Sequence, residues 1–370
     1  MVSTRRFFYD AYSRCVNGSI FDGLKMDMVS FSMDLLASNS HDEQLIGARI
    51  LRQFSISERF CDDTLQKIGI DLSIVERLVE MLNWTDSKEE EIRLSAAEIL
   101  SKLAGKKQNS LRIARIPGTM ESISSLLQTN RSVIPAADEI GEKKLVFDHQ
   151  NYGFWTFNHL GLLILSGKIG NTRGLLPKII DFTHAKEWLL KSENVTSYQV
   201  LTLKRSLQLV KMLASTVGTT GKHLRREISE IVFTISNIRD ILRHGEKHPL
   251  LQKLCIEILT SLALEEDATE RIGGTGRVLE ELFNIFFKHN IPENQKHIKI
   301  VAGEAFAMLA LESKSNCHRI LKLKILEKLV KALKDPLLRV NAARVLRNLC
   351  TYSGSEWFIQ LKGVTAAAPI

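Results

Sequence analysis

An amphipathic helical segment that ends in a Leu-Ala-like dipeptide recurs along this sequence, and the recurrence limits the fold more than any other feature. The last residues of successive copies are 49, 110, 49, 47 and 40 positions apart, and the largest spacing is about twice the others. A period of roughly 45 residues is typical of proteins that stack one small helical unit many times. The copies span residues 44–55, 92–104, 200–214, 251–263, 300–310 and 339–350.

Most copies are expected to be followed by a polar loop of about ten residues and then by a second run with apolar residues at helical spacing. Gly69, Gly118 and Gly274 stand before such runs, where a tight turn between helices favours a residue without a side chain. An Ile-Gly step, as at 68–69 and 272–273, is expected to open these Gly-led helices. Because such a helix group cannot cover its own apolar face, neighbouring groups must stack into an all-α solenoid. The second runs span residues 72–83, 120–128, 227–243, 278–288 and 325–334.

The segments AAEILSKLA (96–104) and NAARVLRNLC (341–350), which alternate with the Gly-led helices, resemble armadillo repeats. The chain as a whole resembles the plant armadillo-repeat superfamily over residues 24–370, with residues 1–23 as an N-terminal flanking segment. HEAT repeats have a similar period and remain an alternative for individual repeats. The resemblance implies a right-handed superhelix of three-helix repeats, whose third helices line a concave groove that holds partner polypeptides. The Gly-led helices are counted here as these third helices.

Three irregularities interrupt the period. Residues 129–151 are polar, contain Pro135 and predict a loop insertion in the array. The repeat is short between Leu165 and Gly170, as if part of it were missing. After residue 350 the pattern stops early, so we expect an array that is truncated at its C-terminus and leaves Val345 and Leu349 partly uncovered.

The net charge of +8 is unevenly distributed. Residues 151–370 contain 31 Lys and Arg against 20 Asp and Glu, whereas acidic residues are in excess over residues 1–150. A basic second half favours acidic protein segments, nucleic acid or anionic lipid head groups as partners. Exposed lysines also keep any helical surface soluble, which is the alternative interpretation.

No motif in the sequence predicts catalysis, a cofactor or a metal site. The Gly-rich stretch 273–276 lacks the residues that complete a phosphate-binding loop, so we interpret it as a turn between helices. His244 and His248 are expected at a helix end beside Gly245, without a third metal ligand. The sequence therefore predicts a non-enzymatic protein without cofactors.

The cysteines bear on the compartment and on the core. Five cysteines without a Cys-x-x-Cys pair fit a reducing compartment, which predicts an intracellular protein of the cytoplasm or nucleus. This prediction is compatible with peripheral membrane association, whereas no apolar run is long enough to span a bilayer. Cys255 and Cys350 lie in apolar stripes, so both are expected to be buried.

The candidate binding residues are basic side chains of the Gly-led helices. Lys324, Lys328 and Lys331 have the spacing of one helical face, and Arg239 and Arg243 repeat an i, i+4 spacing. Such a ladder would pair with an acidic peptide through charge-assisted hydrogen bonds. The sequence thus predicts a scaffold that binds protein partners along its groove. The alternative is a binder of nucleic acid or anionic membranes, although interleaved aromatic residues that favour nucleic acid are missing. The oligomeric state is left open.

Overall fold

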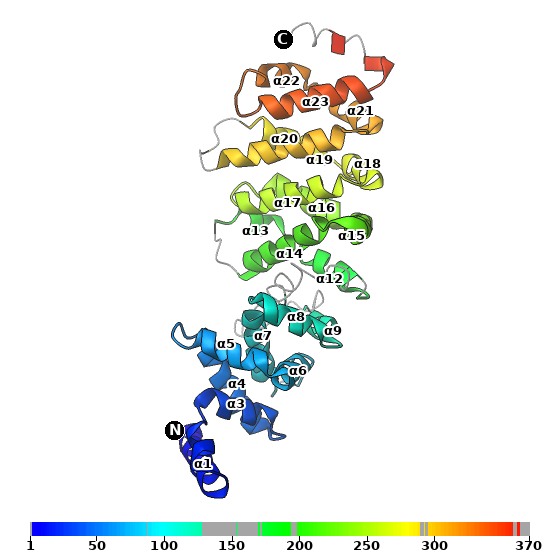
Figure 1. The fold of residues 1–370 in the computed structure, drawn as a ribbon. Helices are drawn as coiled ribbons and strands as arrows, with labels where there is room; N and C mark the ends of the chain where they lie inside the picture. The colour runs from blue at the N-terminus through cyan, green and yellow to red at the C-terminus, as the bar shows by residue number, and fades with distance from the viewer. Residues whose placement is uncertain are drawn as a thin grey trace. The chain divides into compact units, whose positions relative to one another are not determined.

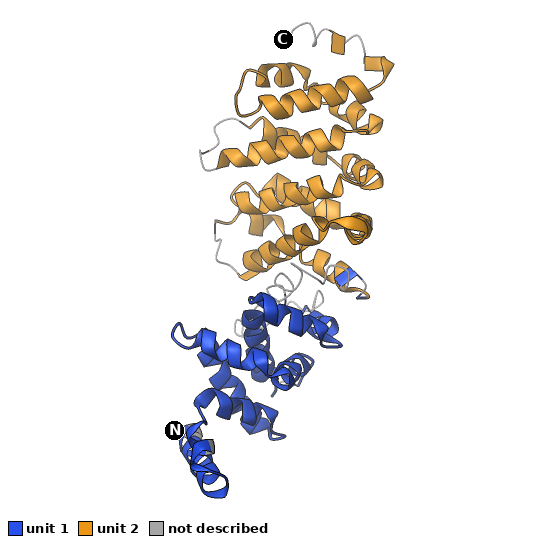
Figure 2. Cartoon of the chain, in the orientation of Figure 1, with its two compact units in different colours: residues 1–172 blue, residues 173–370 orange. Residues whose placement is uncertain are grey.

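The computed structural model describes residues 2–86, 88–127, 153, 169–170, 172–193, 198–288, 292, 295–357 and 361–362. The described residues form helices and connecting turns without any β-strand, as the sequence predicts. They divide into two compact units, residues 1–172 and 173–370 (Figure 2). The expected insertion at 129–151 and most of the short repeat between Leu165 and Gly170 lie outside the described residues.

Each repeat contains three helices, which follow one another as a short helix, a second short helix and a long helix. The polar stretch after each long helix is itself helical, so the expectation of a polar loop there is wrong. The stretch qualifies as a helix because its few apolar residues, such as Ile113 and Ile272, recur on one buried face. The long helix is therefore the third of each repeat, and the Gly-led helix is the second.

Unit 1 starts with a helical hairpin, α1 and α2, which packs on the first repeat. Its helices are α1 (Val2–Asn17), α2 (Ile20–Leu24), α3 (Met28–Ala37), α4 (His41–Ile56), α5 (Cys61–Ile70), α6 (Leu72–Met81), α7 (Glu90–Ala104), α8 (Lys107–Arg115) and α9 (Thr119–Ser125). The long helices α4 and α7 contact each other, and the second helices do so from α3 to α6 to α9. Each kind of helix therefore stacks on its own kind, which is how a solenoid buries a continuous core.

Unit 2 repeats this arrangement in three layers (Figure 1). The first helices are α15 (Gly218–Glu230), α18 (Glu266–Gly274) and α21 (Lys314–Lys322), and the second helices are α12 (Leu175–Asp181), α16 (Thr234–His244), α19 (Val278–Phe286) and α22 (Leu326–Ala332). The long third helices are α14 (Tyr198–Ala214), α17 (Pro249–Leu262), α20 (Lys296–Ala310) and α23 (Arg339–Tyr352), and α13 (Glu187–Lys191) and a 3-10 turn (Ser355–Trp357) complete the unit. All six predicted copies of the Leu-Ala helix are confirmed as long helices of the two units.

The turns before the second helices α9, α12, α19 and α22 each place one residue in the left-handed region of backbone space. Gly118 before α9 and Gly174 before α12 both have a φ of 75°, which confirms the predicted turn glycine at Gly118. Before α19 the left-handed residue is Arg277, with a φ of 70°, so the predicted turn at Gly274 is wrong. Glycine is favoured in this conformation because it has no Cβ to clash with the backbone.

Gly69 and Gly273 are needed for close helix packing rather than for turns. Both lie near the ends of first helices, α5 and α18, so the Ile-Gly steps close these helices instead of opening the next ones. Each glycine packs against an asparagine of the following first helix, Asn109 on α8 and Asn316 on α21. A side chain at either glycine would occupy the space that the asparagine fills, so the first helices stack through a repeated Gly–Asn contact.

The apolar side of the last long helix is covered within the described residues. Val345 and Leu349 are fully buried, so the expectation that they are partly uncovered is wrong. The helix α23 packs against α20 of the preceding repeat and against α21 and α22 of its own repeat. Cys255 is buried as predicted, whereas Cys350 is exposed, because it lies on the opposite side of α23 from that contact.

Candidate functional site

The long helices of unit 2 form one continuous layer, because α14 contacts α17, α17 contacts α20, and α20 contacts α23. This layer contains most of the unit's excess positive charge. The four helices contain nine lysines and arginines but only two acidic residues, Glu257 and Glu304. The four second helices of the unit contain five basic and five acidic residues, and the long helices of unit 1 contain four basic and five acidic residues. The basic surface is therefore specific to one layer of one unit.

Part of this charge lies on one face of the layer. In each helix copy, the positions ten, six and three residues before the last residue are spaced i, i+4 and i+7, so they share one face of the helix. In chain order, this face carries Lys204, Gln208, Lys211, Lys253, Glu257, Thr260, Ile300, Glu304, Ala307, Val340, Arg344 and Arg347. We call its five basic members the basic stripe: Lys204, Lys211, Lys253, Arg344 and Arg347.

Contacts between neighbouring helices confirm that these positions lie side by side. Lys211 Nζ on α14 lies 2.7 Å from Glu257 Oε2 on α17, and Lys253 Nζ lies 3.8 Å from Glu257 Oε1. A single carboxylate therefore serves two ammonium groups, and the pair retains net positive charge. At the other end of the stripe Arg344 and Arg347 are exposed, and Arg347 donates a hydrogen bond of 3.2 Å to the Asn348 side chain.

Buried amide groups hold the last helix in register with the previous one. Asn348 Nδ2 donates to the Ala307 carbonyl at 2.9 Å, and Asn341 Nδ2 donates to the Ile300 carbonyl at 2.9 Å. Both asparagines are buried, so losing either bond would leave a polar group without a partner in the core. The spacing between α20 and α23, and with it the position of Arg344, is therefore fixed by the fold.

The lysines of the predicted ladder do not form one helical face. Lys324 precedes α22 in a left-handed conformation with a φ of 54°, so it is outside the helix that carries Lys328 and Lys331. The prediction that all three share a helical face is therefore wrong, because the helix starts only at Leu326. Lys328 Nζ lies 4.6 Å from the centre of the Phe283 ring of α19, a cation–π contact. Lys331 is exposed.

The two arginines of the predicted ladder lie on α16, beside acidic groups. Arg239 donates two hydrogen bonds to the Asp240 carboxylate, at 2.9 and 2.8 Å. Arg243 Nε lies 4.0 Å from Glu281 of α19, whose pKa is raised by burial and lowered in part by Arg243. The structure thus places four members of the ladder on second helices, in a layer without net charge, and Lys324 in the turn before one of them. The binding role of the ladder stays a prediction.

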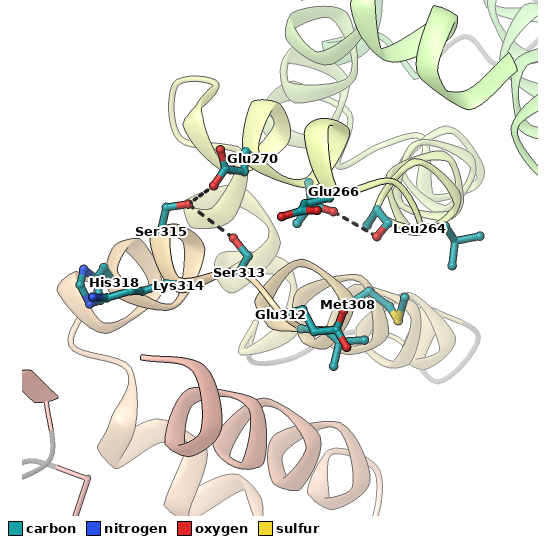
Figure 3. A pocket seen from close by; sticks show the side chains of 12 residues that line it. Leu264, Glu266, Glu270, Met308, Glu312, Ser313, Lys314, Ser315 and His318 are labelled. Atoms are coloured by element: carbon teal, nitrogen blue, oxygen red, sulfur yellow. Dashed lines mark hydrogen bonds between the residues drawn. The ribbon is translucent and has the colours of Figure 1, made fainter. Parts of the chain in front are cut away.

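An acidic cleft borders the layer where α17 and α20 end (Figure 3). Its volume is about 850 Å³, and the carboxylates of Glu266, Glu270 and Glu312 line it together with Lys314 and His318. The Ser315 hydroxyl donates a hydrogen bond of 2.8 Å to Glu270. This cleft repels an acidic segment and so limits the surface on which such a segment can lie.

Two observations concern metal-binding and nucleophilic side chains among the described residues. No cluster of three His, Cys, Asp or Glu side chains with metal-binding geometry occurs among them. Burial raises the pKa of the Cys255 thiol strongly, so this cysteine is a packing residue rather than a nucleophile. None of the helices in the described part of the chain combines the length and the apolar character that a membrane span requires.

The fold is that of an armadillo-like α-solenoid, as predicted. A computationally designed armadillo repeat protein for modular peptide recognition matches 76% of this chain and 99% of its own, with 13% identity and a TM-score of 0.54. A designed armadillo repeat protein in complex with the peptide (KR)4 matches 76% of this chain and all of its own, with 15% identity and a TM-score of 0.51. The structure of Uso1-2 matches 96% of this chain and 55% of its own, with 11% identity and a TM-score of 0.60. No protein-family model matches the sequence, and no curated protein sequence matches it significantly.

Sequence reasoning missed the basic stripe because it counted the Gly-led helices, and not the long helices, as the third helices of each repeat. The signal was present in the residues. Sorting the charges of the second half by helix copy, and not by run length, would have found seven basic residues against two acidic ones on the Leu-Ala helices.

Proposed function

We propose that the protein is a non-enzymatic scaffold that binds an acidic, extended segment of a partner protein along the long helices of unit 2. The concentration of positive charge on this layer carries the proposal. Four stacked helices at the usual spacing of about 8–10 Å span roughly 30 Å, which is the length of about ten residues of extended chain. Lys204 and Arg344 lie on the first and the last of these helices, so one such segment reaches both.

The similar solved structures support a peptide as the ligand. One designed armadillo protein was solved in complex with the basic peptide (KR)4, so a solenoid of similar fold binds a peptide. In the chain described here the surface is basic, so the same peptide would be repelled and its acidic counterpart attracted. Backbone hydrogen bonds alone would not discriminate between these peptides, whereas the charges on the layer do.

The ladder of Arg239, Arg243, Lys324, Lys328 and Lys331 serves as the internal comparison for this proposal. Arg239 and Arg243 already interact with acidic groups of the chain itself, and the second helices carry no net charge. Electrostatic attraction should therefore hold an acidic segment less strongly on the second helices than on the long helices.

The test is fluorescence anisotropy with labelled peptides of about ten residues, one alternating Glu and Asp and one alternating Lys and Arg. The acidic peptide is expected to bind with a salt-dependent affinity, and the basic peptide is not. Lys204→Glu/Arg344→Glu should weaken binding of the acidic peptide at least about tenfold. Lys328→Glu/Lys331→Glu changes the net charge by the same amount and should weaken binding less than about threefold. Equal losses in both variants would show that only net charge matters, which contradicts a specific binding layer.

Nucleic acid is the second candidate, because a basic layer also attracts phosphates. Single-stranded nucleic acid usually stacks its bases on exposed aromatic side chains. In the long helices of unit 2, only Tyr198 and Tyr352 are aromatic and not buried, and both lie at helix ends. We therefore expect an RNA oligonucleotide to compete with the acidic peptide only at low salt, and tight RNA binding at physiological salt would favour this second candidate.

A further inference from the structure

The hairpin of α1 and α2 exposes many large apolar side chains to solvent. Seven large apolar side chains on these two contacting helices are between 62% and 74% exposed, and four of them are aromatic. On α1 they fall at i, i+1, i+4 and i+8, which is one helical face. Exposed apolar patches of this size mark interaction surfaces. The members of this apolar face are Phe8, Tyr9, Tyr12, Val16, Ile20, Phe21 and Leu24.

The opposite side of α1 is fixed to unit 1, so the apolar face is held outward. The Phe7 ring packs edge-on against Phe31 of α3, with ring centres 5.5 Å apart. Arg6 forms an ion pair with Glu43 of α4 at 2.5 Å, and Arg14 forms one with Asp34 of α3. Rotating the helix to bury the apolar face would break these contacts. The exposure is therefore a property of the folded unit.

Exposed basic residues lie at both ends of the apolar face. Arg5 lies at one end of the face on α1, and Lys25 follows α2 at the other end, and both are exposed. Asp10 lies about a third of a helical turn away from the face, and its carboxylate is 3.7 Å from Arg6 Nε. An apolar face rich in Phe and Tyr with basic residues at its edges matches the interfacial region of a lipid bilayer, where rings lie at the depth of the head groups.

We propose that the apolar face of α1 and α2 docks the protein on a membrane that contains anionic lipids. A second copy of the chain fits this face less well. A two-fold contact would place Arg5 and Lys25 of one copy against the same basic groups of the other, with no described acid on the face to pair them. Anionic head groups supply that opposite charge directly above the acyl chains, into which the apolar side chains insert.

The proposal is tested by co-sedimentation of the full chain with vesicles. Vesicles of phosphatidylcholine with about 30% phosphatidylserine should bind the protein, and vesicles of phosphatidylcholine alone should bind it far more weakly. Phe8→Ser/Tyr12→Ser/Phe21→Ser should lower binding to the anionic vesicles at least about tenfold. Arg5→Gln/Lys25→Gln should lower binding and reduce its salt dependence. Circular dichroism of each variant checks that the exposed substitutions leave the fold intact.

Two controls separate this surface from the rest of the chain. Val232→Ser/Phe233→Ser removes two exposed apolar side chains of unit 2 and should leave vesicle binding unchanged. Lys204→Glu/Arg344→Glu removes charge from the long helices, and a loss of vesicle binding only in this variant would assign membrane binding to unit 2 and overturn the proposal. Light scattering in the absence of lipid tests whether the protein is a dimer, which is the remaining outcome. A dimer that the triple serine variant converts to a monomer would identify a second copy as the occupant and overturn the proposal as well.

Discussion

Gly273→Ala is expected to destabilise unit 2, although alanine normally stabilises a helix. An added Cβ would lie 2.7 Å from Asn316 Nδ2 and closer still to the amide oxygen. Asn316 is fully buried, and its Nδ2 donates hydrogen bonds of 2.9 Å to the carbonyls of Thr269 and Leu309. The side chain therefore has no free direction in which to move, and the substitution breaks both bonds.

The size of the effect follows from these contacts. Two lost hydrogen bonds and the unpaired groups that they leave cost about 2–4 kcal/mol. The higher helix propensity of alanine offsets at most about 1 kcal/mol of this loss. The net loss of roughly 1–3 kcal/mol corresponds to a decrease in Tm of about 3–10 °C for a unit of this size.

The neighbouring glycine provides a matched control. At Gly274 the closest atom to an added Cβ is Arg319 Nη2 at 3.5 Å, an ordinary contact. Gly274→Ala should therefore be neutral or slightly stabilising. Thermal and urea unfolding, followed by circular dichroism, compare the two variants. Equal stability of both variants would refute the idea that the first helices stack through the Gly–Asn contact.

Three further predictions concern charge and burial. Burial raises the pKa of Asp27, but hydrogen bonds from Lys67 and Ser30 lower the pKa by a larger amount, so the pKa lies below its usual value of 3.8. The stability advantage of the wild type over Asp27→Asn should therefore be present at neutral pH and disappear as pH falls below that value, and an advantage that persists in strong acid would contradict the assignment. Arg225→Met should lower the free energy of unfolding, measured with urea, by about 3 kcal/mol. The substitution leaves the nearly buried Glu265 carboxylate, 2.8 Å from Arg225 Nη2, unpaired. A loss below about 1 kcal/mol would instead indicate a solvent-exposed pair. Burial raises the pKa of the Cys317 thiol to about 11. This thiol should therefore react with a disulfide reagent at pH 8 far more slowly in the folded protein than in the denatured protein. Equal reaction rates would show that the thiol is accessible in the folded protein.

The repeat and its helices could be predicted because the apolar residues recur at helical spacing in every copy. The segment 251–263, for example, has apolar residues around its helical circumference, as a buried helix requires, and it forms α17. The first helices were harder to recognise. Segments such as EDATERIGG are short and polar, so their helices depend on tertiary packing against the neighbouring helices.

The candidate site was only partly predictable. The composition of the second half indicated a basic surface, but spacing alone does not tell which helix of the repeat carries it. Lys324 illustrates this limit. Its i, i+4 spacing to Lys328 suggests a shared helix, but Lys324 itself has a left-handed conformation in the turn between α21 and α22. Gly273 shows another limit, because the partner that excludes a side chain there is 43 residues away, at Asn316. Such contacts follow from the stacking of repeats, which a local pattern does not describe.

The central claim is that an acidic segment lies along the long helices of unit 2. Zero-length carbodiimide coupling tests it most directly, since this reaction joins carboxylates only to amines in contact with them. A bound Glu-Asp peptide, mapped by mass spectrometry, should couple to Lys204, Lys211 and Lys253. Coupling confined to Lys324, Lys328 and Lys331 would contradict the claim and return the site to the second helices.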